Sequence, residues 1–310
     1  MDTLSRLLSL FTVRTSLDTR CELAAPWVLD EPPAAPGSAP FHVIVAGAAR
    51  VEAPGQDAVT LAAGDIVVFP GGDAHRLLAG SGPASPVTGA APAGPLQRKT
   101  NAGGGPGTDI LCGSFVFDAG ARRALLGALP AVMVVRASQA DDFPALHALV
   151  RILQHESAAQ RPGASAVVAQ LSGALFALLV RAWLVQDASV PAAPGLFAVL
   201  ADRRLGLALQ QMLEAPGQAW RVSELAAACH MSRATFARLF ARLCGMPPAD
   251  ALTRLRMAQA ALALTQGERT LGDIALAVGY QSEAAFNRVF KRHHGIGPGA
   301  YRRGGRSALE

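Results

Sequence analysis

The chain has 310 residues, of which 51% are hydrophobic, which suits two globular domains and excludes a disordered or fibrous chain. Its net charge of +5 is unevenly spread, because residues 205–310 hold 13 Lys or Arg against 7 Asp or Glu, whereas residues 1–204 hold 15 against 16. We therefore expect a polyanion partner for the C-terminal third alone. Four cysteines without close pairing and no apolar leader predict a cytoplasmic protein, and the lack of a clean apolar run of about 18 residues excludes a membrane span.

After an amphipathic start, the first half of the chain has a β pattern. Short apolar runs with Gly and Pro at their corners predict strands over residues 41–45, 50–52, 59–61, 66–69 and 75–78. Such closely spaced strands are typical of a small barrel or sandwich. Residues 80–108, rich in Gly, Pro, Ala and Ser, are expected to form a long mobile loop before a last strand over residues 110–117.

Helices are predicted after the strands, over residues 121–129, 143–157 and 164–186. The last of these is apolar on most faces, so it needs cover from the barrel, a neighbouring helix or a second subunit. We expect residues 143–186 to form the interface of a homodimer, and burial within one chain is the alternative.

A linker is expected over residues 187–202, between a sensor domain at residues 1–186 and a helical domain at residues 203–306. Further helices are predicted over residues 203–213, 223–229, 232–243, 249–265, 271–278 and 282–294. The fold class is thus α+β, with an N-terminal barrel, a helical dimerisation segment and an all-α C-terminal domain.

One helix-turn-helix pattern occurs twice in that domain, fifty residues apart. From Ser232 and from Ser282 onward, each copy places Phe, Arg, Phe, Gly and Pro at the same offsets, although the turn before Ser282 is one residue longer. Serine favours a helix N-cap, and rings four residues apart share the helix face that packs on a small core. The opposite face is free to meet DNA, and the helix over residues 249–265, about 26 Å long, can hold the two copies near the roughly 34 Å spacing of successive major-groove faces.

Residues 205–303 resemble the AraC/XylS family of transcription regulators. The most specific matching residues are Ile274, Ala275, Leu276, Ala277, Val278, Gly279, Tyr280, Ser282, Phe286, Phe290, Lys291, Gly295, Pro298, Tyr301 and Arg302. The resemblance implies a regulator, taken here as an activator, that binds double-stranded promoter DNA and acts with RNA polymerase.

By position, the base-facing residues of the family correspond to eight residues of this chain: Arg233, Ala234, Ala237, Arg238, Glu283, Ala284, Asn287 and Arg288. Arg suits guanine, Asn adenine and Glu cytosine, whereas alanine offers only apolar contact with a thymine methyl. Thr235 is a reserve candidate, and Lys291 is expected to contact phosphate. Phosphate contact is also the alternative for Arg238 and Arg288.

In the first half, Gly64, Pro70, Gly72 and His75 have the spacing of the second motif of cupin barrels. The first cupin motif, with two His and a Glu, is missing, and its strand offers only His42. Since a metal oxygenase site needs about three ligands, we expect neither an enzyme nor a cofactor. Two alternatives stay open: a metal held by His42 and His75, with Cys112 or Asp73, and a metal-dependent cupin enzyme fused to the DNA-binding domain.

The first half also resembles the cupin-like sensor domains of one AraC subgroup, through residues 1–8, Cys21, Trp27, His75 and Cys112 among others. The resemblance implies a thiol switch, with Cys21 as the first candidate and Cys112 as its partner. Arg20 is a candidate for stabilising the Cys21 thiolate. The alternative is that both cysteines are small buried apolar residues, which is also what we expect of Cys229 and Cys244.

Overall fold

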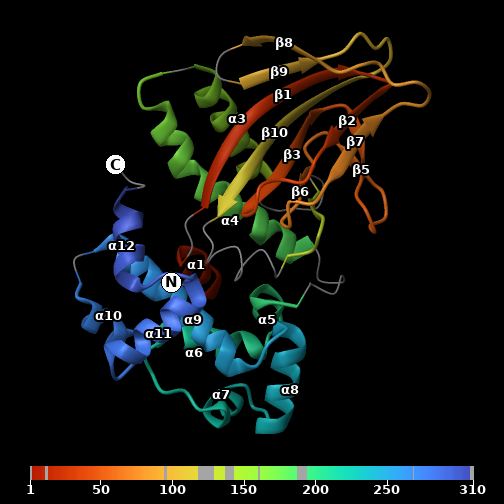
Figure 1. Ribbon diagram of the computed structural model, residues 1–310. Helices are drawn as coiled ribbons and strands as arrows, with labels where there is room; N and C mark the ends of the chain where they lie inside the picture. Colours follow the sequence, from red (N-terminus) through yellow and green to blue (C-terminus); the bar gives the residue numbers. More distant parts are fainter. Residues whose placement is uncertain are drawn as a thin grey trace. The chain divides into compact units, whose positions relative to one another are not determined.

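The computed structural model describes residues 2–10, 13–93, 96–117, 129–136, 143–159, 161–186, 194–267 and 269–307. The chain forms two compact units (Figure 1). One unit contains the strands together with two helices of the middle segment, and the other contains the N-terminal helix and the C-terminal helices.

The larger sheet of the first unit has the strand order β11-β6-β3-β10-β1-β9-β8. Its strands are β1 (Val13–Ala24), β3 (Ser38–Ala46), β6 (Ile66–Val68), β8 (Thr88–Ala93), β9 (Leu96–Thr100), β10 (Gly107–Phe117) and β11 (Met133–Val135). The two longest strands, β1 and β10, pair antiparallel at the centre, and β9 runs parallel to β1. Residues two apart on β1 and β10 therefore share one face of the sheet.

The smaller sheet has the order β2-β7-β4-β5. Its strands are β2 (Trp27–Glu31), β4 (Ala48–Glu52), β5 (Val59–Ala62) and β7 (His75–Ala79). The inward faces of the two sheets enclose one apolar core, whose buried members include Cys21, Leu23, Trp27, Leu29, Ile44, Val51, Leu61, Val67, Phe69, Leu77, Ile110 and Cys112. Two cysteines thus lie inside the barrel, among its largest side chains.

The strands expected between residues 41 and 78 and over residues 110–117 are confirmed, whereas one part of the first half was left unassigned and another was predicted wrongly. No strand was assigned to β1 or β2, and in β1 a register shift between Leu17 and Thr19 interrupts the alternation of side chains. The loop expected over residues 80–108 contains β8 and β9. The composition of β8, TGAAPA, has almost no β propensity of its own, and the strand forms at the sheet edge by pairing with β9.

Helices α3 (Phe143–Ala159) and α4 (Ala164–Gln186) confirm the two longer helices predicted for the middle segment. The ring of Phe176 on α4 packs 5.4 Å from that of Phe115 and 5.1 Å from that of Phe117, so α4 covers a face of the larger sheet. By length and composition, residues 166–186 of α4 would suffice to cross a membrane, but this sheet contact is typical of a core helix. The helix expected over residues 121–129 lies, except for its last residue, outside the described residues.

The second unit is entirely helical in the part that the structure describes. Its helices are α1 (Thr3–Ser9), α5 (Leu196–Ala201), α6 (Leu205–Glu214), α7 (Val222–Ala228), α8 (Arg233–Cys244), α9 (Pro248–Gln266), α10 (Leu271–Ala277), α11 (Glu283–His294) and α12 (Pro298–Ser307). The N-terminal helix α1 packs on α6, with Arg6 Nη2 3.8 Å from Glu214 Oε1.

Helix α5 (Leu196–Ala201) lies within residues 187–202, where a linker was expected. Its residues Leu196, Phe197, Ala198 and Val199 are buried against α6 and α8. Six residues are too few to show a helical period, so the helix depends on this packing and was not predicted. The earlier part of the expected linker, residues 187–193, lies outside the described residues.

Candidate DNA-binding surface and buried thiol cluster

The first helix-turn-helix module consists of α7 and α8. Ser232 caps α8 by accepting a hydrogen bond from the Thr235 backbone N at 3.2 Å, and Gly245 ends the helix in the left-handed conformation with φ 72°. Phe236 and Phe240 are fully buried, with ring centroids 5.6 Å apart. The predicted cap, stop and core face of this helix are confirmed.

The second module, α10 and α11, repeats these features. Ser282 accepts from the Ala285 backbone N at 3.2 Å, Gly295 ends α11 with φ 83°, and Phe286 and Phe290 are fully buried. Their cluster also contains Ile274, Val278 and Met257 from the two neighbouring helices. Each phenylalanine pair therefore fixes the roll of its helix, which decides the residues that face outward.

The turns of the two modules differ, as the extra residue in the second copy predicts. His230 in the first turn has φ 53°, whereas Gly279 in the second has φ 86°. A Cβ atom at Gly279 would lie 2.8 Å from both Arg256 Nη2 and the Gly217 carbonyl oxygen. The second turn thus requires glycine, while the first holds a histidine in a conformation that costs a non-glycine residue free energy.

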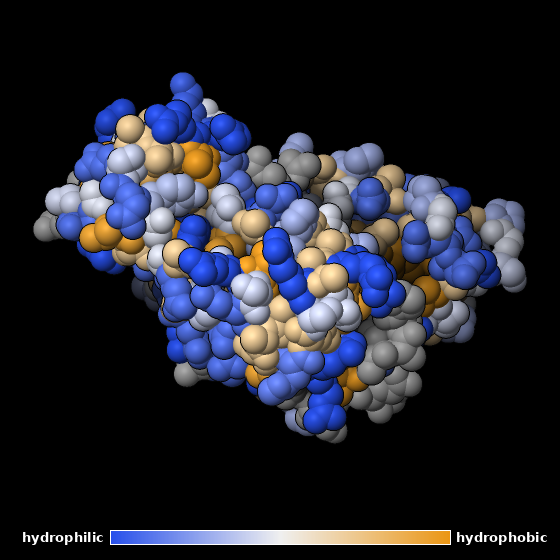
Figure 2. Space-filling view, turned by 90° about the horizontal axis from the view of Figure 1, so that it is seen from below, coloured by the Kyte–Doolittle hydropathy of each residue, from blue (hydrophilic) through white to orange (hydrophobic). Residues whose placement is uncertain are grey.

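The residues predicted to read DNA lie on the outward faces of α8 and α11. The exposed ones are Arg233, Ala234, Thr235, Arg238, Glu283, Ala284, Arg288 and Lys291, whereas Ala237 and Asn287 are half-buried. Among the described residues, no carboxylate lies within 4 Å of the Arg233, Arg238 or Arg288 guanidinium. On the face seen from below, hydrophilic side chains predominate around small apolar patches (Figure 2).

Helix α9 connects the two modules without interruption. Its 19 residues correspond to about 28 Å at 1.5 Å per residue. Pro248 begins it at a position where the missing N–H costs no helical hydrogen bond. A rigid spacer of this length is compatible with two helices that enter successive major-groove segments, roughly 34 Å apart.

In the other unit, the fold brings Cys21 and Cys112 together in the core of the barrel. Cys21 is opposite Ile110 in the β1–β10 pair, and Cys112 is opposite Thr19, so the two cysteines are diagonal neighbours on one face. Their exposed fractions are 0% and 9%, and the thiol of Cys112 hydrogen-bonds the sulfur of Cys21. Both remain free thiols.

Two buried histidines extend this pair into a chain of hydrogen bonds across the barrel. His42 is opposite Cys112 in the β3–β10 pair, and its Nδ1 lies 3.1 Å from Cys112 Sγ. Its Nε2 lies 2.8 Å from Nε2 of His75, on β7 of the smaller sheet. His75 Nδ1 in turn lies 2.9 Å from the Asp73 carbonyl oxygen. We call these four residues, Cys21, Cys112, His42 and His75, the thiol–imidazole cluster.

The environment makes the two thiols chemically unequal. The hydrogen bond from Cys112 lowers the pKa of Cys21 below its ordinary value, against the opposing effect of burial, and the Lys99 ammonium lowers it further. The same hydrogen bond, together with burial, raises the pKa of Cys112 well above its ordinary value. Cys21 is therefore the more acidic thiol of the pair, and Cys112 is held in its protonated form.

The cation that acts on Cys21 is Lys99, so the assignment to Arg20 was wrong. Successive side chains of a strand point to opposite faces, and Arg20 points out of the barrel, where it binds Asp109 at 2.8 Å and 3.1 Å. Lys99 is the partner of Cys21 in the parallel β1–β9 pair and shares its face. It was missed because β9 was predicted to be a loop.

Burial also determines the state of the histidines. It lowers the pKa of His42 to about 3, with a smaller contribution from His75, so His42 is neutral at pH 7. Burial lowers the pKa of His75 as well, but the Asp73 carbonyl and the carboxylates of Glu31 and Asp73 oppose this effect. Among the described residues, no group of three or more His, Cys, Asp or Glu is arranged to hold a metal ion.

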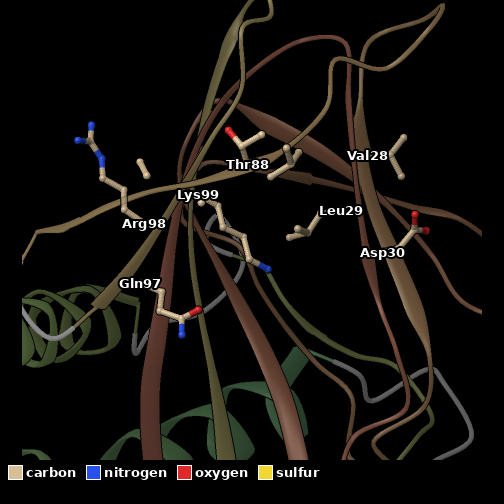
Figure 3. A pocket seen from close by; sticks show the side chains of 10 residues that line it. Val28, Leu29, Asp30, Thr88, Gln97, Arg98 and Lys99 are labelled. Atoms are coloured by element: carbon tan, nitrogen blue, oxygen red, sulfur yellow. The ribbon is translucent and has the colours of Figure 1, made fainter.

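A cavity of about 410 Å³ lies between β2 and the β8–β9 hairpin (Figure 3). Lys99 points into it from β9, toward Leu29, whereas Arg98 points away. The remaining residues around it are Val28, Asp30, Val87, Thr88, Gly89, Ala90 and Gln97. Lys99, which shares a face of the sheet with Cys21, is thus one wall of this cavity, while Cys21 itself is fully buried.

The fold and the outward-facing helices define a helix-turn-helix DNA-binding protein with a cupin barrel. The family model described as "Cupin" matches residues 2–185, and the one described as "Helix-turn-helix domain" matches residues 225–304. The chain belongs to the AraC-type transcriptional regulators, as its similarity to whole proteins of that family shows.

Three such relatives match along almost their whole length. The chain is 33% identical to the "RCS-specific HTH-type transcriptional activator RclR" of Escherichia coli, over 97% of both chains. It is 31% identical to the "HTH-type transcriptional regulator MtrA" of Neisseria gonorrhoeae, over 98% of this chain and 99% of the relative. A "Putative AraC-like transcription regulator" of Streptomyces antibioticus is 32% identical, with the same shares covered.

Proposed function

We propose that this regulator is an activator that responds to two-electron oxidants through Cys21 and Cys112. The observation that carries the proposal is the buried thiol pair, in which the pKa of Cys21 is lowered by the hydrogen bond from Cys112 and by Lys99. A thiol with thiolate character beside a second thiol is typical of redox sensors. The position of Lys99 also supports the proposal, because it is paired with Cys21 across β1 and β9 and lines a cavity of about 410 Å³.

Disulfide formation would move β1 against β10. Diagonal neighbours of an antiparallel pair have Cα atoms about 7 to 8 Å apart, whereas a disulfide needs about 4.4 to 6.8 Å. At the most common disulfide spacing of about 5.5 to 6 Å, oxidation of Cys21 and Cys112 would therefore draw the strands together by about 1 to 2.5 Å. Strand β1 follows α1 in the chain, and α1 packs on α6 of the DNA-binding unit, so this movement can reach the helices that bind DNA.

On DNA, the exposed outer faces of α8 and α11 support base reading by the residues named above. Arg233, Arg238 and Arg288 are the candidates for guanine, with Glu283 for cytosine and Asn287 for adenine. Lys291 lies in the last turn of α11 and is suited to phosphate contact. As an activator, the protein would act on RNA polymerase at the promoter that it binds.

A homodimer is supported by the apolar surface that α3 and α4 leave uncovered. Ile152 on α3 and Val167 and Val185 on α4 are 46%, 40% and 62% exposed. Exposed apolar side chains on two neighbouring helices are suited to a second copy of the same surface. Ile152→Glu combined with Val167→Glu is expected to halve the mass measured by sedimentation equilibrium, and an unchanged mass would contradict this interface.

The thiol switch is tested with Cys21→Ala in the full chain. We expect this variant to bind promoter DNA as the reduced wild-type protein does and to lose all oxidant-dependent activation, measured with a reporter promoter in cells. Cys244→Ala is the matched control, because Cys244 is equally buried but burial raises its pKa to about 11. Full oxidant response in Cys21→Ala would contradict the proposal.

The second candidate is an effector that binds in the cavity beside Lys99. Its volume of about 410 Å³ lies in the range of small-molecule sites, and its lining combines apolar Val28, Leu29 and Val87 with the Lys99 ammonium and the Asp30 carboxylate, which suits a small organic molecule with polar groups. Native mass spectrometry of the protein purified from its own cells tests this idea. A stoichiometric small molecule that Lys99→Met loses would support it, and a ligand-free wild-type protein would contradict it.

A further inference from the structure

We infer that His42 and His75 form a proton relay for the thiol pair, in which His42 accepts the proton of Cys112 when Cys112 attacks the oxidised sulfur of Cys21. This inference rests on the proposed thiol switch and adds two residues to it. It also gives a role to two buried histidines that the DNA-binding function does not use.

The hydrogen-bond chain fixes the tautomer of each ring. A carbonyl oxygen only accepts, so the contact between His75 Nδ1 and the Asp73 oxygen places the hydrogen of neutral His75 on Nδ1. His75 Nε2 is then an acceptor, and His42 must donate to it from Nε2. This leaves His42 Nδ1 without a hydrogen, 3.1 Å from Cys112 Sγ, as an acceptor for the Cys112 thiol.

Cys112 needs such an acceptor, because its high pKa keeps it protonated at neutral pH. A thiol attacks an oxidised sulfur as its thiolate, so the proton must leave during the attack. Before oxidation, the Cys112 thiol can donate its hydrogen bond to either Cys21 or His42, since both lie within hydrogen-bond reach. Once the Cys21 sulfur is oxidised it is no longer a thiolate acceptor, and the Cys112 proton turns to His42.

His75 can hold the positive charge that His42, a weak base in this core, cannot. His42 cannot hold a positive charge there, since burial lowers its pKa to about 3. If His42 passes its Nε2 hydrogen to His75 while it takes up the Cys112 proton, the charge lies on His75. That ring faces the carboxylates of Glu31 and Asp73 and stacks on Phe69 at 3.5 Å, whereas Lys99 acts on His42.

The reaction balances with hydrogen peroxide as the only reactant that the protein does not supply. In the first step, the Cys21 thiol reacts with hydrogen peroxide to give a sulfenic acid and water. In the second step, Cys112 Sγ bonds to Cys21 Sγ, and the hydroxide that leaves Cys21 combines with the proton held by the imidazole pair. The products are the disulfide and a second water molecule, and both histidines return to their neutral tautomers.

The experiment separates these two steps in the full-length protein. His42→Asn keeps an oxygen acceptor near the position of Nδ1 and removes the base, and His75→Gln keeps an acceptor near Nε2 but cannot hold the charge. His155→Asn on α3, where the histidine is exposed, is the matched control. After mixing with hydrogen peroxide, Cys21 sulfenic acid is trapped with a 1,3-dione, and the disulfide is followed by mass spectrometry between pH 6 and pH 8.

We expect all three variants to form sulfenic acid at the wild-type rate. Disulfide formation is expected to be about 100- to 10,000-fold slower in His42→Asn and His75→Gln at pH 7, the size of effect that a general base supplies. In His42→Asn its rate is expected to rise about tenfold per pH unit, as the thiolate fraction of Cys112 does, whereas the wild-type rate varies little. Thermal unfolding of each variant verifies that it is folded.

Three results would overturn parts of this account. A wild-type rate and pH profile of disulfide formation in folded His42→Asn and His75→Gln would overturn the relay and leave the thiol switch intact. A wild-type protein that forms neither sulfenic acid nor disulfide would overturn the thiol switch itself. A stoichiometric metal that His42→Asn loses would also overturn the relay, because an imidazole nitrogen bound to a metal cannot accept a proton.

Discussion

The DNA-facing helices and the thiol–imidazole cluster place their functional side chains in opposite environments. Arg233, Arg238 and Arg288 stand in solvent on α8 and α11, each next to a buried phenylalanine pair that only orients the helix. Cys21 and His42, by contrast, are themselves part of the barrel core. Exposed groups can be changed one at a time, whereas in the cluster each proton position depends on the next residue.

The largest expected effect is on stability, and it tests whether α11 has one buried face that packs and one exposed face that does not. Phe286→Ala is expected to lower the free energy of unfolding of the DNA-binding unit by about 3 to 5 kcal/mol, because it leaves a cavity beside Phe290 and Ile274. Arg288→Ala, two residues away on the exposed face, is expected to change it by less than about 0.5 kcal/mol. Urea unfolding of the full chain measures both, and equal losses would contradict the assignment of the two faces.

The next effect concerns the barrel and depends on pH. The folded pKa of His42 is about 3 against 6.5 for the free side chain, so below pH 6.5 the unfolded chain binds a proton that the folded chain does not. Stability therefore falls as pH falls from 6.5 toward 3, by about 2 kcal/mol between pH 6.5 and pH 5 for this group. His75 adds to the same trend.

Denaturant titration at the two pH values measures this loss, with His42→Asn as the comparison. The variant removes the titrating group, so its stability is expected to vary less over the same range. An equal acid loss in both proteins would show that His42 is not buried as a neutral imidazole.

Binding tests the outer face of α11. Arg288→Ala is expected to weaken binding to the specific site by about 1 to 3 kcal/mol and binding to random DNA much less, if the guanidinium reads a base. Arg292→Ala is the comparison, because Arg292 lies in the last turn of α11 and is expected to contact phosphate. This variant is therefore expected to lose the same affinity for both DNAs. Fluorescence anisotropy at fixed salt measures the four affinities, and an equal loss for Arg288→Ala would assign it to phosphate.

The smallest effect concerns the helix caps, which are shared by the two modules. Ser232→Ala and Ser282→Ala each remove one hydrogen bond of 3.2 Å to a backbone N–H. Each is expected to cost about 1 kcal/mol of stability. Thermal unfolding measures both, and a loss in only one variant would show that the two helix starts are not equivalent.

The DNA-binding unit could be predicted well from the sequence because its signals are local. The caps Ser232 and Ser282, the phenylalanine spacing and the glycine stops all act within one helix, and they gave both helices nearly to the residue. Helix α5 escaped prediction because packing, and no pattern of its own, stabilises it.

The thiol–imidazole cluster could be predicted only in part. Cys21, Cys112, His42 and His75 were named, but residues so far apart in the chain meet only through strand register, which depends on the register shifts of the β1–β10 and β3–β10 pairs. The order of the hydrogen bonds, from the Cys112 thiol to His42 and then to His75, could therefore not be predicted from the sequence. Nor could Lys99, whose role follows from the pairing of an unpredicted strand.

The central claim is that oxidation inside the barrel changes how the two modules bind DNA. The most direct test is a footprint of the full-length protein on a promoter fragment selected from genomic DNA, with the thiols reduced and after complete formation of the Cys21–Cys112 disulfide. We predict that the protected major-groove segments of wild type differ between the two states and that those of Cys21→Ala do not. Identical footprints of reduced and fully disulfide-bonded wild-type protein would contradict the claim.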